Sequence, residues 1–306
     1  MIIQLPVLFF ALLIDRVCGD PKTSLHPVAL IGQVIGWWGR PEQYPKPLHR
    51  FIGVIGWLGT VILFTLPFAL FQMAAPWYVY LIAGPFLLKI CFAWRALEEH
   101  ARAVAQAASK QERAHQASLL VSRDTSVLTE EQILSAAYES VAENLNDSII
   151  APLFWFLILG LPGAAMYRAI NTMDAMLGYT DERKDLGWCA ARMDDIFSFI
   201  PARICGLLLF ILYALKGRIR PAYAIFIRDR KKRPGFNGGI PMSLIAGGEG
   251  ILFEKPGMYR IGEGIVTLRE AGPSIIRTVR LSTLLFCLFA GIALVLLDGA
   301  PNIYGI

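Results

Sequence analysis

The sequence predicts an all-α, polytopic helical integral membrane protein that carries amphipathic cytoplasmic helices and a basic loop. The chain has 306 residues, is 55% hydrophobic and has a mean hydropathy of +0.51. Only 17% of its residues are charged, whereas about a quarter are charged in ordinary soluble proteins. Three apolar segments, 51–71, 77–94 and 281–297, are each about long enough to cross the ~30 Å of hydrocarbon in a bilayer. No internal repeat or low-complexity linker divides the sequence, so we expect a single membrane-embedded domain over residues 1–306.

The N-terminal segment predicts a further membrane helix. Residues 1–14 are apolar but lack the basic n-region and the small-residue cleavage site of a signal peptide. We therefore expect a retained first helix, which either crosses the bilayer or stops short of crossing it. Aromatic residues stand near the ends of the 77–94 segment, as in an interfacial belt: Trp77, Tyr78, Tyr80 and Trp94.

The polar segment 95–147 predicts two amphipathic helices joined by a turn near Ser122. Thr129 and Gln132 have the spacing of a capping box, which would start the second helix. One face of that helix is apolar and should be buried. It carries Leu134, Tyr138, Val141 and Leu145.

Two later segments leave the membrane topology open. Residues 149–167 are apolar, but Pro152 and the break at Gly160 are typical of a bent or re-entrant hairpin as well as of an interrupted span. It is also open whether residues 196–215 cross the bilayer completely. The answer for these two segments decides on which side of the membrane the following polar segment lies. That segment, 216–280, has thirteen Lys and Arg against five Asp and Glu, which predicts a cytoplasmic position.

The composition argues against several classes of protein. Five cysteines are scattered without a CxxC pair or a Cys/His cluster, so neither a disulfide framework nor a zinc site is expected. The net charge of +5 suits a membrane surface or a phosphate-bearing substrate. Because no basic-aromatic motif accompanies that charge, we expect no nucleic-acid partner.

The most informative motif is a series of acids that leads into an apolar segment. Glu139, Glu143 and Asp147 recur every fourth residue, so a helix would place them on one face. Acids at the edge of a bilayer are costly unless they bind cations, a phosphate-bound metal or basic partners. The same spacing opposite an apolar stripe is also typical of a solvated helix face, and both interpretations stay open.

Two shorter motifs lie outside this helix. Asp20 and His26 each precede a proline, which restricts them to extended geometry. Asp20 is a candidate Mg²⁺ ligand and His26 a candidate for phosphate contact or proton transfer, with ordinary turns as the alternative. Arg123 and Asp124 precede the acidic helix, either as a functional pair or as a turn that Asp124 caps.

Polar residues also border the later apolar segments. Asn171 and Asp174 would share a helical face just past one of them. Asp194 and Asp195 stand beside Arg192 at the start of another, and this combination of carboxylates with a guanidinium suits a metal–phosphate site. An intrahelical ion pair between Arg192 and Asp195 is the alternative.

A basic run from Arg228 to Arg233 is followed by a glycine-rich turn at Asn237. Such a turn can present backbone N–H groups to an anion, although a cytoplasmic loop under the positive-inside rule would have the same composition. The sequence has no Walker A motif and no convincing GxGxxG, so a nucleotide would bind by another route.

Together these motifs resemble the CobD/CbiB family, the adenosylcobinamide-phosphate synthases of cobalamin biosynthesis. The resemblance extends from about residue 12 to about residue 280, with the motifs in the expected order. The residues that carry it are Asp15, Gly19, Asp20, Pro21, His26, Pro27, Val28, Arg123 to Ser126, Glu139 to Asn144, Asp147, Ala151 to Phe154, Asn171 to Asp174, Gly178, Tyr179, Ala191 to Asp195, Pro201 to Arg203, Arg228 to Arg230 and Asn237.

The resemblance implies an ATP-dependent ligation with Mg²⁺ as the metal. A carboxylate of adenosylcobyric acid would be joined as an amide to (R)-1-aminopropan-2-ol phosphate or a related amino-alcohol phosphate. The implied catalytic residues are Glu139, Glu143, Asp194 and Asp195, with Glu143, Asp194 and Asp195 as metal ligands. The implied phosphate clamps are Arg123, Arg192 and Arg228, and the implied contacts to corrin amides are Asn144, Asn171 and Asn237. The other implied substrate-binding residues are Asp20, His26, Asp124, Asp147, Asp174 and Arg203.

The chain departs from the family pattern at a few positions. Ser148 stands where similar members often have glycine. Ile240 and Met242 stand where the family usually has a tryptophan and a glutamate, and Glu249 lies nearby but out of register.

Two other classes of membrane protein compete with the synthase. A non-catalytic, AmpE-like signalling relative would have no need of the acid-rich motifs. A transporter would place ionisable groups near the bilayer midplane, whereas segments 51–71 and 281–297 carry no charge. For the synthase we expect a multi-pass protein of the cell membrane, in contact with lipid, with its active site facing the cytoplasm. Docking of other corrinoid-assembly enzymes on the basic loop stays open.

Overall fold

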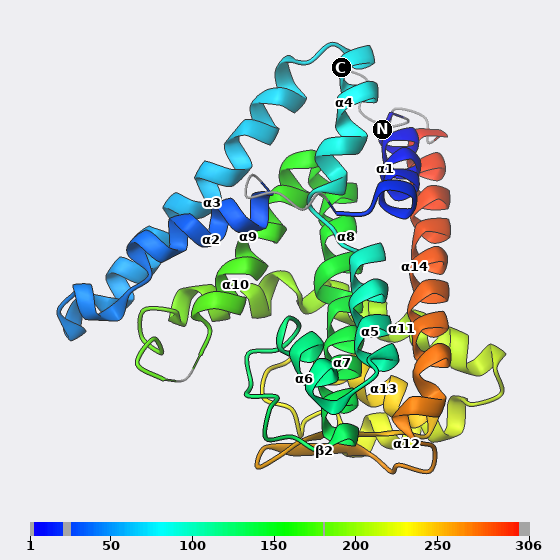
Figure 1. Ribbon diagram of the computed structural model, residues 1–306. Helices are drawn as coiled ribbons and strands as arrows, with labels where there is room; N and C mark the ends of the chain where they lie inside the picture. Colours follow the sequence, from blue (N-terminus) through cyan, green and yellow to red (C-terminus); the bar gives the residue numbers. More distant parts are fainter. Residues whose placement is uncertain (1–2, 21–25, 180, 300–306) are drawn as a thin grey trace. The chain divides into compact units, whose positions relative to one another are not determined.

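The computed structural model describes residues 3–20, 26–179 and 181–299, and it is mostly helical (Figure 1). This confirms the predicted all-α class, to which the structure adds one short β-hairpin. The chain divides into two compact units that interleave along the sequence. The first unit comprises the chain up to residue 93, residues 151–197 and the chain from residue 289; the second comprises residues 94–150 and 198–288.

Among its described residues, the first unit contains seven complete α-helices, and two short 3-10 turns, η1 (Pro41–Gln43) and η2 (Lys46–Leu48), precede its longest helix. The helices are α1 (Gln4–Cys18), α2 (Pro27–Trp38), α3 (His49–Ala74), α4 (Trp77–Lys89), α8 (Ala151–Leu159), α9 (Leu161–Leu177) and α10 (Trp188–Phe197).

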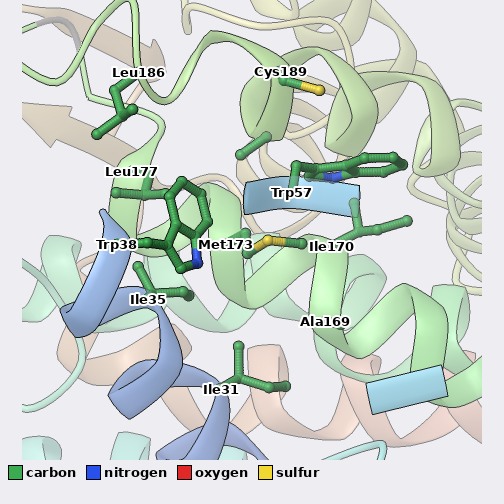
Figure 2. Packing of buried hydrophobic residues seen from close by; sticks show 11 residues of the cluster. Ile31, Ile35, Trp38, Trp57, Ala169, Ile170, Met173, Leu177, Leu186 and Cys189 are labelled. Carbon is green, nitrogen blue, oxygen red and sulfur yellow. The ribbon is translucent and has the colours of Figure 1, made fainter. Parts of the chain in front are cut away.

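The core of the first unit lies among α2, α3, α9 and α10, and Figure 2 shows its side chains. Ile31, Ile35 and Trp38 of α2 pack with Ile170 and Met173 of α9. These positions recur at helical spacing, so each helix turns one apolar stripe inward. The indole nitrogen of Trp38, buried in this core, donates a hydrogen bond to the Thr60 hydroxyl of α3 at 3.1 Å, so its polar atom is paired.

The apolar segment 149–167 takes the bent form rather than a continuous helix. Gly160 separates α8 from α9 with φ of 72°, a conformation that a side chain would strain. Gln72 of α3 binds both sides of the break, because its side chain accepts from the Leu161 N–H at 2.9 Å and donates to the Leu159 carbonyl at 3.4 Å. The break between α8 and α9 is therefore built into the packing.

Two of the described helices are long and apolar enough to cross a membrane, namely residues 46–74, which include α3, and residues 268–296 of α14 (Leu268–Gly299). Only 11% of the apolar window in residues 46–74 is buried within the protein. Its outward-facing side chains, such as Phe51 and Ile62, therefore need a lipid environment. The pair formed by α10 and α11, interrupted at Ser198, is a third candidate.

Helices α1 and α4 are short for a membrane span, and α4 is also shorter than the predicted segment 77–94. Helix α1 has 15 residues and α4 has 13, which correspond to about 22 Å and about 20 Å at 1.5 Å per residue. The prediction of a span over 77–94 is therefore wrong in extent. Helix α4 ends at Lys89, where the next residues form a turn and the buried lysine pairs with acids.

The second unit contains the polar helices and the hairpin. Its elements are α5 (Arg95–Gln106), α6 (Lys110–Ser118), α7 (Glu130–Asn144), the π-helix η3 (Leu145–Ile150), α11 (Phe199–Leu215), α12 (Ile219–Asp229), α13 (Gly239–Glu249), β1 (Leu252–Lys255), β2 (Tyr259–Gly262) and the first part of α14. The antiparallel strands pair Leu252 with Gly262 and Lys255 with Tyr259.

The prediction of two amphipathic helices in segment 95–147 is wrong in number, since the structure has three. The first predicted helix is divided before Lys110 because Ser109 caps a new helix, accepting from the Glu112 N–H at 3.1 Å. The capping box of Thr129 and Gln132 is confirmed. The apolar stripe of α7 is confirmed as well, since Leu134, Tyr138, Val141 and Leu145 are all buried.

Candidate functional site

The first acid of the motif, Glu139 on α7, is buried and bound on several sides. Its side chain is 2% exposed and pairs with Arg123 at 2.5 Å between Oε2 and Nη2. Ser135 donates to Oε1 at 2.6 Å, and the Tyr259 hydroxyl donates to Oε2 at 2.9 Å. The solvated-face interpretation is therefore wrong for Glu139, because the β-hairpin covers this part of the helix.

The hairpin is held on α7 by the same serine. The Ser135 hydroxyl accepts from the Glu254 N–H of β1 at 2.7 Å, and strand pairing then places Tyr259 opposite Lys255. Burial and the adjacent Glu139 carboxylate raise the pKa of Tyr259, so its hydroxyl stays a hydrogen-bond donor at neutral pH. The geometry around Glu139 is thus fixed by local hydrogen bonds.

The second acid, Glu143, forms an ion pair with Arg233 from the basic run. Gly238 makes room for this pair, since a Cβ there would lie 2.8 Å from both Arg233 Cζ and Glu143 Oε1. Burial, with repulsion from Arg123 and Arg233, lowers the pKa of Lys255, and Glu139 offsets part of that effect. Three basic side chains therefore share two carboxylates, and an anion would relieve their mutual repulsion.

Beyond Glu143 the helix widens into the π-helix η3, which lies within the predicted motif. π-helical turns are rare and are frequently found at functional sites. Asn144 is held across this change, because its amide donates to the Ser140 carbonyl at 2.9 Å and its oxygen accepts from Ser148 at 2.7 Å. The Ser148 departure thus adds an anchor for Asn144. Asp147 lies within η3, where it accepts from the Asn146 amide at 2.7 Å.

Asn237 lies just before α13, at the turn that the sequence suggested for anion binding. Its side-chain oxygen accepts from Arg203 Nη1 of α11 at 2.6 Å, and Arg203 also donates to the Phe199 carbonyl at 2.9 Å. Helix α13 begins at Gly239, so backbone N–H groups and an arginine meet at this end of the helix. This combination suits a phosphate group.

The structure favours a structural role for Arg228. Its guanidinium binds both oxygens of buried Asp229, at 2.8 and 2.9 Å, and Glu263 at 2.8 Å. Asp229 also accepts from the Gly262 N–H at 2.9 Å, and these contacts lower the pKa of Asp229 despite its burial. Arg228 could clamp a substrate phosphate only by giving up these bonds, so that role stays a prediction.

Glu249, the acid that lies out of register with the family pattern, is buried as well. It accepts from the Tyr213 hydroxyl at 3.1 Å, from Lys216 at 3.2 Å and from Thr278 at 2.8 Å. Glu249 therefore connects α13 with α11 and α14, while Met242 is fully buried.

In the first unit, the N-terminal motif is gathered around Lys89 of α4. This lysine is 3% exposed and pairs with buried Asp15 at 3.1 Å and with Asp20. Nearby, Arg168 of α9 donates to the Cys91 carbonyl at 2.8 Å. Asp20 therefore has a fixed cationic partner from a distant part of the sequence.

His26 caps α2 in this region. Its Nδ1 accepts from the Val28 N–H at 3.3 Å, which confirms a local turn role for the His-Pro motif. Burial lowers the pKa of His26, with a smaller opposing effect from Asp20 and further lowering by Arg168 and Lys89. The imidazole is thus held neutral, as the cap requires.

A second polar group in the first unit joins α9 and α10. The Asn171 amide donates to Asp194 Oδ1 at 3.2 Å. Arg192 lies 3.5 Å from Asp195 along the same helix, so the intrahelical pair expected as the alternative is present. Asp174 lies one turn beyond Asn171, and its carboxylate borders Gly178 at the end of α9.

The donor sets can be tested against Mg²⁺. Among the described residues, no group of three or more His, Cys, Asp or Glu side chains has the geometry to hold a metal ion. Mg²⁺ that arrives with a nucleotide needs less, because it usually keeps several waters and takes one or two carboxylates plus phosphates. Asp194 and Asp195 supply two adjacent carboxylates of this kind, although Asp195 pairs with Arg192 as Glu143 pairs with Arg233. The metal assignments stay predictions.

Several residues of these clusters were missed from sequence. Lys89 was the easiest of them to predict from sequence, because a lone lysine in an apolar segment usually marks a functional or paired site. Arg233 belonged to a basic run in which no single residue stood out. Lys255 and Tyr259 had no sequence signal, since a hairpin brings them to α7 from over a hundred residues away.

Comparisons with known proteins show the family to which this chain belongs. The family model described as CobD/Cbib protein matches residues 8–282. The chain belongs to the CobD/CbiB family. It is 37% identical over 302 residues to the probable cobalamin biosynthesis protein CobD of Methanothermobacter thermautotrophicus, covering 96% of this chain and 99% of the relative.

Two further family members match at similar levels. The cobalamin biosynthesis protein CobD of Dehalococcoides mccartyi is 38% identical, covering 85% of this chain and 87% of its own. The probable CobD of Thermococcus kodakarensis is 40% identical, covering 82% of each chain. No solved structure matches this protein. The family match covers residues of both units, which include every candidate site residue.

Proposed function

We propose that this protein is an adenosylcobinamide-phosphate synthase. It would join a carboxylate of adenosylcobyric acid to the amine of (R)-1-aminopropan-2-ol phosphate, or a related amino-alcohol phosphate, at the cost of ATP. The proposal rests on membership of a cobalamin-biosynthesis family. The observation that supports the chemistry is the cluster in which Arg123, Arg233 and Lys255 surround two acids.

The reaction requires activation of a carboxylate, because a carboxylate does not form an amide with an amine unaided. The simplest route transfers the terminal phosphoryl group of ATP to the corrinoid carboxylate and releases ADP. The amine then attacks the acyl carbon of the mixed anhydride and expels inorganic phosphate, and the amine loses a proton. Atoms and charges balance with one ATP used for each amide formed.

The basic side chains supply the electrostatic part of this mechanism. Arg233 would stabilise oxygens of the transferred phosphoryl group, with Glu143 holding its guanidinium in place, while Arg123, held by Glu139, would bind the phosphate of the amino-alcohol substrate. Arg203 and the start of α13 would bind another phosphate of the nucleotide. When bound, Mg²⁺ would neutralise phosphate charge. Asp194 and Asp195 of the first unit are the candidate ligands for Mg²⁺, with Asn171 positioning Asp194.

The remaining candidates would orient the corrinoid. Asn144 and Asn171 would hydrogen-bond corrin side-chain amides, and Asp20 would be positioned for substrate by Lys89. The two candidate membrane helices support a position in the cell membrane. We propose that the active site faces the cytoplasm, where ATP is available, in agreement with the basic composition of residues 216–280.

A matched pair of variants tests the proposed site. Glu143→Gln removes the carboxylate that holds Arg233 but keeps the shape of a partly exposed side chain. We expect amide formation to fall at least tenfold, with an unchanged melting temperature. Lys184→Gln, an exposed residue outside the candidate site, is the control and should retain full turnover. Wild-type turnover by Glu143→Gln would remove Glu143 from the mechanism.

A further inference from the structure

A cavity of about 440 Å³ lies between α6 and the loop that follows it, within the second unit. One wall is a single face of α6, since its residues recur at helical spacing. These residues are Lys110, Gln111, Ala114, His115 and Ser118. The other wall is the loop formed by Arg123, Asp124, Thr125 and Ser126.

Both walls of this cavity are fixed by hydrogen bonds. The buried Thr125 hydroxyl donates to the Ala114 carbonyl of α6 at 2.7 Å, so the loop is tied to the helix. Asp124 Oδ1 accepts from the Ser126 N–H at 2.9 Å and from the Ser126 hydroxyl at 2.6 Å. The hollow is therefore a preformed feature, and its volume lies within the range of small-molecule sites, about 300–1,000 Å³.

The lining carries charges of both signs. Lys110, His115 and Arg123 provide N–H donors that suit a phosphate group. Asp124 provides a carboxylate in the same cavity. The hydrogen bonds from Ser126 lower the pKa of Asp124, so it is an anion at neutral pH. A ligand that matches this lining carries a phosphate and an ammonium on one small skeleton.

Arg123 connects the cavity to the acidic motif. One nitrogen of its guanidinium, Nη2, binds Glu139 at 2.5 Å. The other terminal nitrogen, Nη1, is buried and has no hydrogen-bond partner in the part of the chain that the structure describes. A buried donor without an acceptor is costly, and a phosphate oxygen would supply the acceptor. Arg123 therefore has one donor nitrogen that no described residue pairs with, and a phosphate ligand would bring the acceptor for it.

We propose that this cavity binds the amino-alcohol phosphate, with its phosphate near Lys110, His115 and Arg123 and its ammonium near Asp124. This inference rests on the proposed function, which supplies the identity of the ligand. ATP fits the cavity less well, because it has no cationic group to meet Asp124 and would be repelled by that carboxylate. The site therefore selects the amine-bearing substrate over the nucleotide.

The test is calorimetric binding to the full-length protein in detergent, without ATP or corrinoid. The probes are 1-aminopropan-2-ol phosphate, propyl phosphate, 1-aminopropan-2-ol and ATP. The variants change exposed residues and should fold: Lys110→Gln, Asp124→Asn and Ser118→Phe, with Lys184→Gln as the control.

We expect wild-type protein to bind the amino-alcohol phosphate more tightly than either fragment. Lys110→Gln should weaken binding about tenfold, the scale of one charged hydrogen bond. Asp124→Asn should abolish the preference over propyl phosphate, and Ser118→Phe should weaken binding by filling the cavity. Lys184→Gln should bind as the wild type does.

Other results overturn the inference. The inference is wrong if the wild-type protein does not bind the amino-alcohol phosphate, or if all three cavity variants bind it as tightly as the wild type does. It is also wrong if ATP displaces the bound amino-alcohol phosphate. Steady-state assays separate this failure from failure of the proposed function. Amide formation with an unchanged KM for the amino-alcohol phosphate in all three variants refutes the cavity assignment alone. The expected binding pattern without any amide formation refutes the synthase and leaves the cavity assignment standing.

Discussion

Replacement of Lys89 by methionine tests the buried ion-pair cluster of the first unit. Lys89 is 3% exposed and Asp15 is fully buried, whereas Asp20 is 26% exposed. Methionine keeps the length of the side chain but removes its charge. Asp15 then remains buried and loses its ion pair with Lys89, while water can reach Asp20. Most of the expected destabilisation therefore comes from Asp15.

The magnitude follows from this burial. Removal of one partner from a buried ion pair typically costs about 3–5 kcal/mol. Since a chain of this size changes Tm by about 2 °C per kcal/mol, Lys89→Met should lower Tm by about 6–10 °C. The measurement is thermal unfolding in detergent, followed by fluorescence, with Lys184→Gln as the matched control for loss of one lysine charge.

A second variant separates the charge from the packing. Replacing both members of a buried ion pair by apolar residues is often neutral, so Lys89→Met combined with Asp15→Leu should recover most of the lost Tm. If Lys89→Met alone melts within 2 °C of the wild type, the ion-pair argument is refuted. If the double variant melts below both single variants, Lys89 stabilises by some means other than its pairing with Asp15.

Two further predictions concern local geometry. Gly238→Ala places a methyl group 2.8 Å from Arg233 and Glu143. Turnover should therefore fall about tenfold or more, while Tm drops by only a few degrees. Full turnover would show that the Arg233–Glu143 ion pair is dispensable. His26 has a pKa below its ordinary value of 6.5, so the unfolded chain takes up the proton first as the pH falls, and stability should decline from pH 7 to pH 5. His26→Asn keeps the cap to Val28 without titrating there. Its Tm should change less with pH than that of the wild type, and an equally steep profile would contradict a role for His26.

Local patterns predicted the elements better than their lengths. The capping box at Thr129 and the break at Gly160 were predictable because short-range chemistry decides both. The end of α4 was not, since hydropathy continues past Lys89, whereas the chain turns there and the lysine pairs with acids from α1 and the following loop. The division before Lys110 was overlooked, although Ser109 and Glu112 carry a capping signal.

The acidic motif was predictable in position but not in environment. Helical spacing put Glu139 and Glu143 on one face, yet the same spacing is typical of a solvated surface. The burial of Glu139 under Tyr259 and the pairing of Glu143 with Arg233 depend on segments that reach α7 only through tertiary folding. The π-helix that follows also had no signal in the apolar periodicity. A single sequence specifies residues and local caps, whereas contacts between distant segments needed the structure.

The most direct test of the account is a turnover assay on the detergent-solubilised protein. The reaction contains adenosylcobyric acid, (R)-1-aminopropan-2-ol phosphate, ATP and Mg²⁺. The corrinoids are separated by chromatography, and their masses are measured by mass spectrometry. The account predicts a product with the mass of adenosylcobinamide phosphate, formed only with ATP and with one ADP released per amide. Folded protein that gives no amide with this substrate or with ethanolamine phosphate would contradict the proposed synthase and favour a non-catalytic member of the family.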